Sequence, residues 1–276
     1  LGARLERLGL PQRVIERLRS IERRRDDAGL FAPLVTRVPH FCAGCPHARS
    51  TQVPEGSIAL AGIGCHSLRV WMPESRTMIL PQMGGEGASW FGIAPFTSTN
   101  HVFQNLGDGT YVHSGSLAIR AAVAARCNIT FRILYNQATA MTGGQKIEGN
   151  PGVSEIVRQV LAEGASRVAV IADESRRYQS DIAAIPGVST HHRRDLDLVQ
   201  RELRATPGVT IIVYDQMCAT EKRRLAKRGK TRAPRVRPFI NERVCEGCGD
   251  CGAYSNCAAI LPLDTPIGRK RRIDQS

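Results

Sequence analysis

Short apolar runs alternate with stretches of helical periodicity through the middle of this chain of 276 residues. The runs have the length of buried strands, and the stretches between them space their apolar residues as a helix does. Strand, helix and strand in repeated order predict an α/β fold, with a parallel sheet and helices on both of its faces. The expected strands are residues 57–64, 101–107, 129–136, 167–173 and 209–215. The expected helices are residues 86–94, 115–126, 153–163 and 195–204.

The flanks of this region differ in character. Residues 1–37 have a charged helical pattern broken at Pro11, and we expect lead-in helices from a preceding domain. Residues 38–220 would form the α/β domain. Residues 221–237 are strongly basic and are interrupted by Pro and Gly, which we interpret as a linker without a helix. Residues 238–276 are dense in cysteine and are expected to form a small metal module, incomplete at its C-terminal end.

The composition narrows the class of protein. A hydrophobic content of 42% is that of a folded globular chain. There is neither a membrane-length apolar run nor an apolar leader, so we expect a cytoplasmic protein without membrane contact. The net charge of +13 indicates an acidic partner, but only 5% of residues are aromatic, which argues against a base-stacking nucleic-acid surface. Because the chain does not begin with Met, we expect a segment of a longer protein.

A Gly-Asp-Gly sequence, Gly107 to Gly109, ends an expected strand directly before a helix. Bare backbone at the carboxyl end of a strand lets a phosphate approach, but Asp108 would repel it unless a divalent cation lies between them. One helix and one strand later, Asn136 reaches the same edge of the sheet. An octahedral Mg²⁺ would take the Asp108 carboxylate, the Asn136 amide oxygen, the Ala138 carbonyl, two diphosphate oxygens and a water. The alternative is a simple turn and a helix cap.

The segment GDGTYVHSGSLAIRAAVAARCNITFRILYNQATAMTGGQ, residues 107–145, resembles the thiamine-diphosphate motif of the 2-oxoacid:ferredoxin oxidoreductases. In that motif an aspartate and an asparagine or threonine bind Mg²⁺, and a Thr-Gly-Gly-Gln-like segment follows. The flanking FCAGCPH, GIGCHSL and MGGEGASWFG are similar to those of the indolepyruvate ferredoxin oxidoreductases, in the long form that fuses thiamine and iron–sulfur parts to further domains. The resemblance implies thiamine diphosphate and Mg²⁺ as cofactors, with Thr142 and Gly143 beside them.

A glycine-rich loop precedes the first expected helix. Gly84, Gly85 and Gly87 would let a helix N-terminus approach the cofactor closely, although any tight turn also uses glycine. We interpret Glu86 as a charged residue at the helix start, without a chemical role.

Two cysteine–histidine pairs form the candidate catalytic group. The resemblance places Cys45 and His47, and likewise Cys65 and His66, near the thiazolium ring and the substrate. A positive or hydrogen-bonding group there would steady a 2-oxoacid carboxylate. Two alternatives stay open. One is a tetrahedral zinc site of Cys42, Cys45, Cys65 and His66, and the other is buried, inert thiols with a satisfied histidine.

The strongest metal motif is C-x2-C-x2-C-x5-C, formed by Cys245, Cys248, Cys251 and Cys257. Three thiolates at this close spacing wrap one face of a cubane, whereas zinc knuckles usually supply two separated pairs. We therefore predict a [4Fe–4S] cluster with Cys257 as its fourth ligand. Structural zinc is the alternative.

The resemblance implies oxidative decarboxylation of a 2-oxoacid, an arylpyruvate such as indolepyruvate, to CO₂ and an acyl-CoA. Thiamine chemistry yields a strong reductant, and the cluster would pass its electrons to ferredoxin. Expected partners are therefore ferredoxin, coenzyme A, the 2-oxoacid, further domains of the same enzyme and a second copy in a homo-oligomer. The alternatives are a non-oxidative thiamine decarboxylase and a zinc-bearing binding protein. Cys127 and Cys218 show no motif spacing and are expected in the core.

Overall fold

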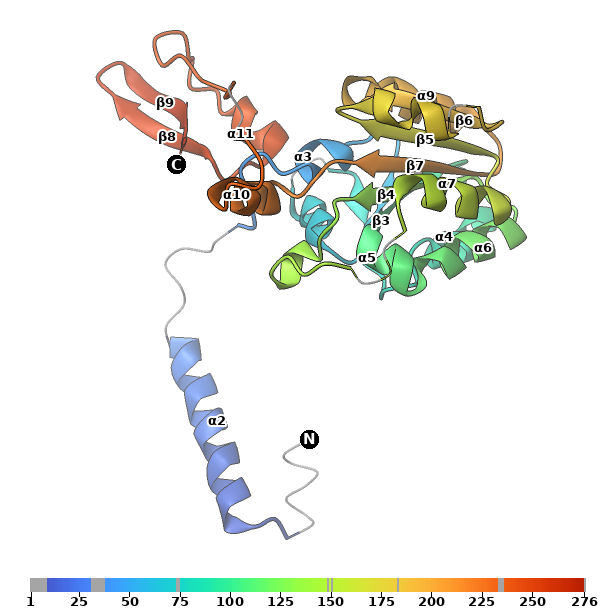
Figure 1. Cartoon of the computed structure of the whole chain (residues 1–276). Coiled ribbons are helices and arrows are strands. Elements are labelled where there is room, and N and C mark those ends of the chain that lie inside the picture. The colour runs from blue at the N-terminus through green and yellow to red at the C-terminus, as the bar shows by residue number, and fades with distance from the viewer. Residues whose placement is uncertain are drawn as a thin grey trace. The chain divides into compact units, whose positions relative to one another are not determined.

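The chain divides into two compact units, Leu1–Val38 and Pro39–Ser276. In the first unit, helix α2 (Gln12–Leu30) begins directly after Pro11, as the sequence predicts (Figure 1). The expected helix before Pro11 lies almost entirely outside the described residues. The computed structural model describes residues 9–30, 38–72, 75–147, 149, 151–182, 184–232 and 236–275.

The second unit is built on a parallel sheet, so the predicted α/β fold is confirmed. Within the described residues the sheet has seven strands in the order β2-β1-β3-β4-β7-β5-β6. Every residue of β4 and β7 is buried, as expected for strands covered on both faces. The strands are β1 (Ala59–Leu60), β2 (Thr77–Met78), β3 (Val102–Gly107), β4 (Ile129–Tyr135), β5 (Arg167–Ala172), β6 (Val188–His192) and β7 (Val209–Asp215).

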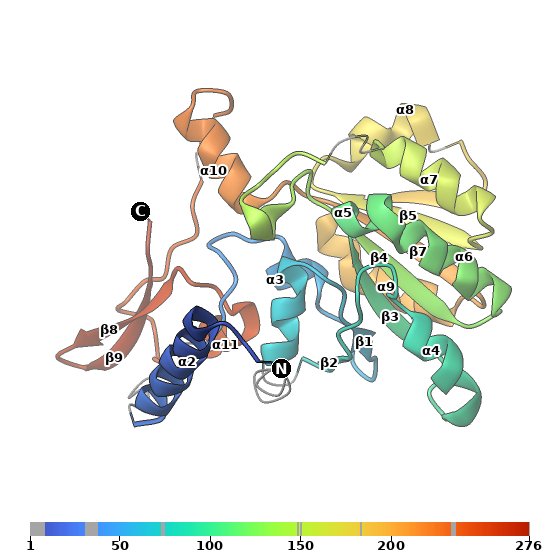
Figure 2. The same cartoon turned by 90° about the horizontal axis from the view of Figure 1, so that it is seen from below.

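Different helices cover the two faces of this sheet (Figures 1 and 2). α4 (Ala88–Ile93), α6 (Ser116–Ala124) and α7 (Val153–Ala162) pack their apolar side chains on one face. α9 (Leu196–Ala205) packs on the other. Residues 133–135 of β4 and 211–214 of β7 contribute alternately to the two cores, as the two-residue period of a strand requires.

Shorter elements connect these helices and strands. They are α3 (His47–Ser50), η2 (Cys65–Trp71), η3 (Ala94–Phe96), α5 (Asp108–Thr110), the π turn η4 (Tyr111–Gly115), η5 (Ala140–Thr142), η6 (Ser175–Tyr178), α8 (Gln179–Ile182) and η7 (Arg193–Asp195).

The strand order determines where a ligand site can form. β3, β4 and β7 are neighbours and run in the same direction, so the segments that follow them meet at one edge. Backbone hydrogen bonds join two of these segments, from Gln216 N–H to Tyr135 O (3.1 Å) and from Cys218 N–H to Asn136 O (3.3 Å).

The C-terminal part contains two helices and a hairpin. Helix α10 (Ala219–Lys227) occupies the start of the basic stretch, so the prediction that this stretch excludes a helix is wrong for its first half. The reason is that no Gly or Pro occurs there before Gly229. Helix α11 (Asp250–Ser255) is followed by an antiparallel hairpin of β8 (Ile260–Thr265) and β9 (Gly268–Ile273).

No helix in the described ranges combines the length and the apolar character that crossing a membrane requires.

Candidate functional site

Asp108 joins two neighbouring strands at their carboxyl ends. It follows β3 directly and is 3% exposed. Its Oδ2 accepts hydrogen bonds from the backbone N–H groups of Asn136 (2.9 Å) and Gln137 (2.8 Å), and its Oδ1 accepts one from Gly109 (2.9 Å). Burial raises the pKa of Asp108 above its ordinary value, although these N–H groups oppose the rise. The carboxylate is thus held in one orientation where β3 and β4 end.

Asn136 lies beside Asp108, and the predicted meeting of these residues at one edge is confirmed by their hydrogen bond. Its Oδ1 accepts a hydrogen bond from Ala138 N–H (3.0 Å), and its Nδ2 lies 3.5 Å from His47 Nε2. Carboxylate, amide and carbonyl oxygens are hard ligands of the kind that Mg²⁺ takes. No three His, Cys, Asp or Glu side chains in the described residues are arranged to hold a metal ion, so a cation here needs further oxygens from its ligand.

A compact turn follows Asn136 and contains Thr142 and Gly143. Thr142 Oγ1 donates a hydrogen bond to Gln145 Oε1 (2.7 Å), and Thr139 N–H donates one to Gln145 O (2.9 Å). Gly143 and Gly144 have φ angles of +116° and +83°, which favour glycine strongly. Thr142, Gly143 and Gln145 are exposed, and the contact of this turn with a cofactor stays a prediction.

The glycine loop before α4 packs against the chain that follows Asp108. Gly84 has a φ angle of +86°, and a Cβ atom there would clash with the Ser114 side chain. Glu86 is fully buried, and its Oε2 accepts a hydrogen bond from Gly84 N–H (2.7 Å). Its Oε1 has no partner among the residues that the structure describes. Burial raises the pKa of Glu86. The interpretation of Glu86 as a helix-start charge is therefore wrong, because α4 begins at Ala88 and the carboxyl group instead stabilises the loop.

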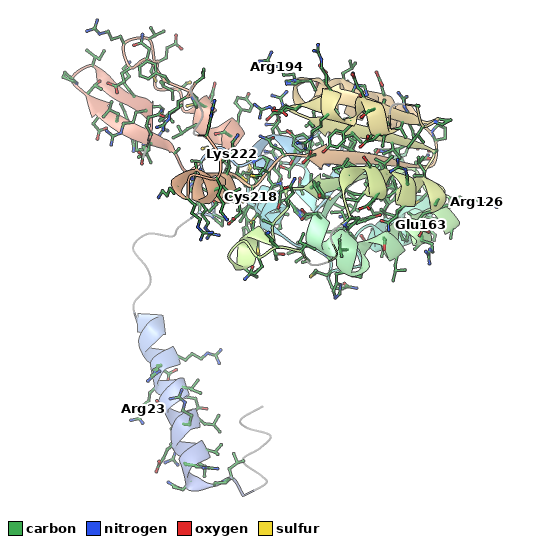
Figure 3. The ribbon with its side chains drawn as sticks, viewed as in Figure 1. Arg23, Arg126, Glu163, Arg194, Cys218 and Lys222 are labelled. Atoms are coloured by element: carbon green, nitrogen blue, oxygen red, sulfur yellow. The ribbon has the colours of Figure 1, made fainter. Side chains whose placement is uncertain are left out.

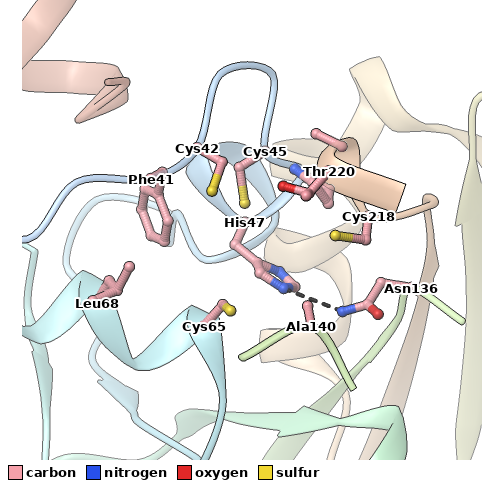
Figure 4. Close-up of a pocket in the computed structure, with 12 residues that line it drawn as sticks. Phe41, Cys42, Cys45, His47, Cys65, Leu68, Asn136, Ala140, Cys218 and Thr220 are labelled. Atoms are coloured by element: carbon pink, nitrogen blue, oxygen red, sulfur yellow. Dashed lines mark hydrogen bonds between the residues drawn. The ribbon is translucent and has the colours of Figure 1, made fainter. Parts of the chain in front are cut away.

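Four cysteine thiols line one pocket next to Asn136, as Figure 4 shows. Cys42 and Cys45 come from the loop before α3, Cys65 begins η2, and Cys218 follows β7. Burial raises the pKa of Cys45 to about 12, and repulsion by the other three thiolates contributes to the rise. The four side chains thus face one pocket, although in the described residues they are not arranged as a metal site. We call this group the thiol pocket.

Cys218 was expected in the core, and this expectation is wrong. Its position after β7 brings it to the edge where β4 ends, so its side chain lines the thiol pocket (Figure 4). It takes the place that the zinc alternative gave to His66, which does not line the pocket. Cys127, by contrast, is 8% exposed within the main apolar core, as expected.

His47, which lines the pocket, forms a buried pair with His66. Their rings are 5.7 Å apart at an interplanar angle of 83°. Burial lowers the pKa of His47 to about 4, and burial together with the charges of His47 and Arg132 lowers the pKa of His66 to about 3. Both rings are therefore neutral near pH 7, and the expectation of a positive group here is replaced by one of hydrogen bonding. Both ring nitrogens of His66 lack a partner within the described residues.

Arg132 is a buried cation that sequence reasoning missed. It lies on β4, is 0% exposed, and donates from Nη1 to Gln52 O (2.7 Å) and Gln200 Oε1 (2.9 Å). Its Nε and Nη2 have no partner in the described part of the chain. Burial, and then repulsion by Arg69, lowers the pKa of Arg132 to about 9. An arginine inside the apolar run ITFRILY was the signal that could have revealed it.

The sequence of the sheet region is similar to that of a known cofactor-binding domain. The family model described as thiamine pyrophosphate enzyme, C-terminal TPP binding domain, matches residues 62–174. Indolepyruvate oxidoreductase subunit IorA of Methanothermobacter marburgensis is 27% identical over 252 residues, which are 86% of this chain and 38% of that protein. The same subunit of Methanothermobacter thermautotrophicus is 30% identical over 245 residues, 84% of this chain and 36% of that protein. Over most of its length the chain is therefore similar to this subunit of the indolepyruvate oxidoreductases.

The chain spans between 36% and 38% of the length of these two relatives. Among solved structures, a 2-oxoglutarate:ferredoxin oxidoreductase from Magnetococcus marinus is similar, with a TM-score of 0.48 and 19% identity. That similarity covers 67% of this chain and 66% of that one. The match to the thiamine pyrophosphate domain includes Asp108 and Asn136, which places the carboxylate and the amide within the cofactor-binding domain of the family.

The C-terminal cysteines surround α11 and are more exposed than the thiol pocket. Cys248 and Cys251 are exposed, whereas Cys245 and Cys257 are partly buried. Lys270 Nζ donates a hydrogen bond to Cys245 O (2.6 Å), which ties the cysteine loop to the hairpin. Since the described residues contain no group of side chains arranged to hold a metal ion, the iron–sulfur site of this segment stays a prediction.

Proposed function

We propose that this chain is the thiamine-diphosphate-binding part of an enzyme that oxidatively decarboxylates 2-oxoacids, with an arylpyruvate such as indolepyruvate as its substrate. The products would be CO₂ and an acyl-CoA, and the electrons would reach ferredoxin. The observation that carries the proposal is the contact between Asp108 and Asn136 inside the matched thiamine pyrophosphate domain. The relatives' name, indolepyruvate oxidoreductase, supports the substrate class and the oxidative outcome. Further domains, and a second copy of the chain, would complete the enzyme.

The residues at the sheet edge fit a Mg²⁺-diphosphate group. Asp108, Asn136 and the Ala138 carbonyl would hold the cation, and diphosphate oxygens would complete its shell. A Cβ atom at Gly109 would meet its nearest protein atom at 3.7 Å, so packing within the protein does not require glycine there. A ligand that needs the space would explain it. Gly107 is tighter, because a Cβ atom there would lie 3.3 Å from His66 Nε2.

Thiamine diphosphate, when bound, supplies the nucleophilic carbon and the electron sink for decarboxylation. The chain's own contribution would come from His47 and His66, which can bind the 2-oxoacid by hydrogen bonds while staying neutral. Both ring nitrogens of His66 lack a partner in the described residues, but the residue is only 2% exposed, so a substrate would have to enter beside His47 to reach them. Cys45 and Cys65 would lie beside the substrate on the side of the thiol pocket.

The thiol pocket carries the ligand type of a first electron acceptor, although its thiols would have to move together to bind iron, because the described residues hold no such arrangement. Its four thiols come from three segments of the chain, and Asn136 forms part of the same wall. Thiolates are the ligands of [4Fe–4S] clusters, and bound iron would offset the repulsion that raises the pKa of Cys45. Under this proposal Cys245, Cys248, Cys251 and Cys257 hold a second cluster nearer to ferredoxin.

Replacement of Asp108 tests the cofactor site. Asp108→Ala removes the only carboxylate of the proposed Mg²⁺ shell, so Mg²⁺-thiamine diphosphate should bind at least about tenfold more weakly in calorimetric titration. Asp197→Ala is the matched control, since Asp197 is an exposed carboxylate on α9 that pairs with Arg201. The proposal is wrong if both variants bind the cofactor as tightly as the parent.

A further inference from the structure

Helix α10 contacts two loops that border the thiol pocket. Arg223 Nη1 donates a hydrogen bond to Ala43 O (2.7 Å), within the loop that carries Cys42 and Cys45. Arg224 Nη1 donates one to Gly143 O (2.6 Å), within the turn that follows Asn136. Adjacent residues of one helix therefore hold a thiol-bearing loop and a turn of the proposed cofactor site.

Backbone hydrogen bonds also hold the start of α10 in place. Cys218 N–H donates a hydrogen bond to Asn136 O (3.3 Å), and Lys222 N–H closes the first helical turn on Cys218 O (2.9 Å). Figure 3 shows Cys218 at this point and Lys222 one turn later. The helix is thus anchored directly to the end of β4.

The turn packs against side chains of α10 at a position whose backbone favours glycine. Gly144 has a φ angle of +83°, and a Cβ atom there would lie 2.6 Å from Arg224 Nη1 and would also clash with the Glu221 carboxylate. Glu221 and Arg224 form an ion pair one helical turn apart, which fixes the guanidinium group against Gly143. Movement of the turn must therefore move α10 or break these contacts.

We propose that α10 couples the turn at residues 142–145 to the loop at residues 42–45, with Arg223 and Arg224 as positioning residues. Binding of Mg²⁺-thiamine diphosphate at the turn orders the thiol-bearing loop, and ordering of that loop strengthens cofactor binding by the same factor. Arginine suits both positions because its planar guanidinium group keeps a fixed direction at a carbonyl oxygen. The inference rests on the proposed function for the identity of its ligand.

Hydrogen exchange followed by mass spectrometry tests this coupling in the full chain. In the parent, adding Mg²⁺-thiamine diphosphate should slow exchange of the amides in residues 42–50 by about fivefold, the lower range of measured couplings. In Arg223→Ala the cofactor should still bind, within about fivefold of the parent affinity, but protection of this loop should be lost. Arg224→Ala should lose the protection and also bind the cofactor more weakly.

Two further variants separate positioning from general destabilisation. Lys222→Ala removes the same charge from the same helix without a contact to either loop, and it should keep the protection. Arg223→Lys keeps a donor and should restore part of it. If the parent binds the cofactor but its loop exchange does not change, the coupling is wrong and the proposed function stands. If the parent does not bind the cofactor, both fail.

Discussion

The two sets of four cysteines differ in how sequence and structure reveal them. The C-terminal set lies within 13 residues and is obvious in the sequence, and its thiols lie around a short helix, two of them exposed. The thiol pocket draws its members from residues 42–218, and no spacing in the sequence predicts the full set, yet the fold gathers them in one place. Cysteines that are close in sequence can be brought into position by the metal that they bind. Cysteines that are far apart in sequence depend on the sheet to bring them together.

The largest expected effect contrasts one cysteine from each set. Cys248→Ser in anaerobically purified protein should abolish the electron paramagnetic resonance signal that the C-terminal cluster gives after reduction. It should also make residues 238–275 protease-sensitive, because this module has little apolar core. Cys218→Ser should lose iron from the thiol pocket while the sheet stays folded. Both variants should lose ferredoxin reduction almost completely, since each interrupts the proposed electron path.

Limited proteolysis and iron analysis decide this contrast. Each variant should contain about four fewer iron atoms per chain than the parent. Only Cys248→Ser should release a C-terminal fragment on proteolysis. Retention of all iron and full ferredoxin reduction by Cys248→Ser would show that the C-terminal cysteines do not carry electrons. Unfolding of the sheet in Cys218→Ser would show that the pocket also depends on its metal.

A smaller effect concerns the sheet domain alone. Its buried carboxyl group, Glu86, should make the stability of the fold depend on pH. The folded state raises the pKa of Glu86 above its ordinary value of 4.5 through burial. The folded state therefore keeps a proton that the unfolded state releases, and the parent loses stability as pH rises from 4.5 toward the folded pKa. Glu86→Gln cannot ionise, so its stability relative to the parent should rise by about 1 kcal/mol across this range.

Urea unfolding at several pH values measures this difference. Glu163→Gln is a control of opposite sign, because the Arg120 guanidinium holds the pKa of Glu163 below its ordinary value. Loss of the Glu163 carboxylate should lower the stability at pH values above the ordinary pKa of Glu163. It should have no effect at pH values well below the pKa of Glu163 in the folded state. A Glu86→Gln variant whose stability followed the parent at every pH would contradict a buried, proton-retaining carboxyl group.

The smallest effect concerns the exposed cations of α10. Lys222 and Lys227 are exposed and have no side-chain hydrogen bond or ion pair in the described residues, unlike Arg223 and Arg224. Their charge should help an acidic ferredoxin approach, so neutralising both should reduce the salt dependence of ferredoxin reduction by roughly twofold. Neutralising Arg13 and Arg17 on α2 is the control. If ferredoxin reduction has the same salt dependence in the parent and in the α10 variant, the exposed lysines of α10 do not attract ferredoxin.

The sequence predicted the central elements because their apolar patterns are strong. The expected strands 101–107 and 209–215 agree with β3 and β7 within one residue. β6 (Val188–His192) was missed because its VSTHH sequence is polar, and β2 because it has two residues. Such edge strands depend on pairing with a neighbour more than on their own composition.

The candidate site was predictable only where its residues are close in sequence. Asp108 and Asn136 are separated by one helix and one strand, so the crossover rule placed them together. Cys218 reaches the site only through the insertion of β7 beside β4, which no local pattern reveals. The buried states of Glu86 and Arg132 depend on tertiary packing, and sequence reasoning gives charged residues to the surface by default.

The central place of β7 also affects how the chain emerges during synthesis. β7 lies between β4 and β5, although it follows every other strand of this sheet along the described chain. Before it emerges, a nascent chain holds two separate ribbons, each with an open apolar edge, for roughly a few seconds at ordinary translation rates. When β7 pairs with β4 and β5, it joins the two ribbons into one sheet, and Cys218 reaches the thiol pocket at almost the same time. A ribosome-bound chain that stops short of Asp215 would therefore lack both the closed core and the completed pocket, and would be prone to aggregate.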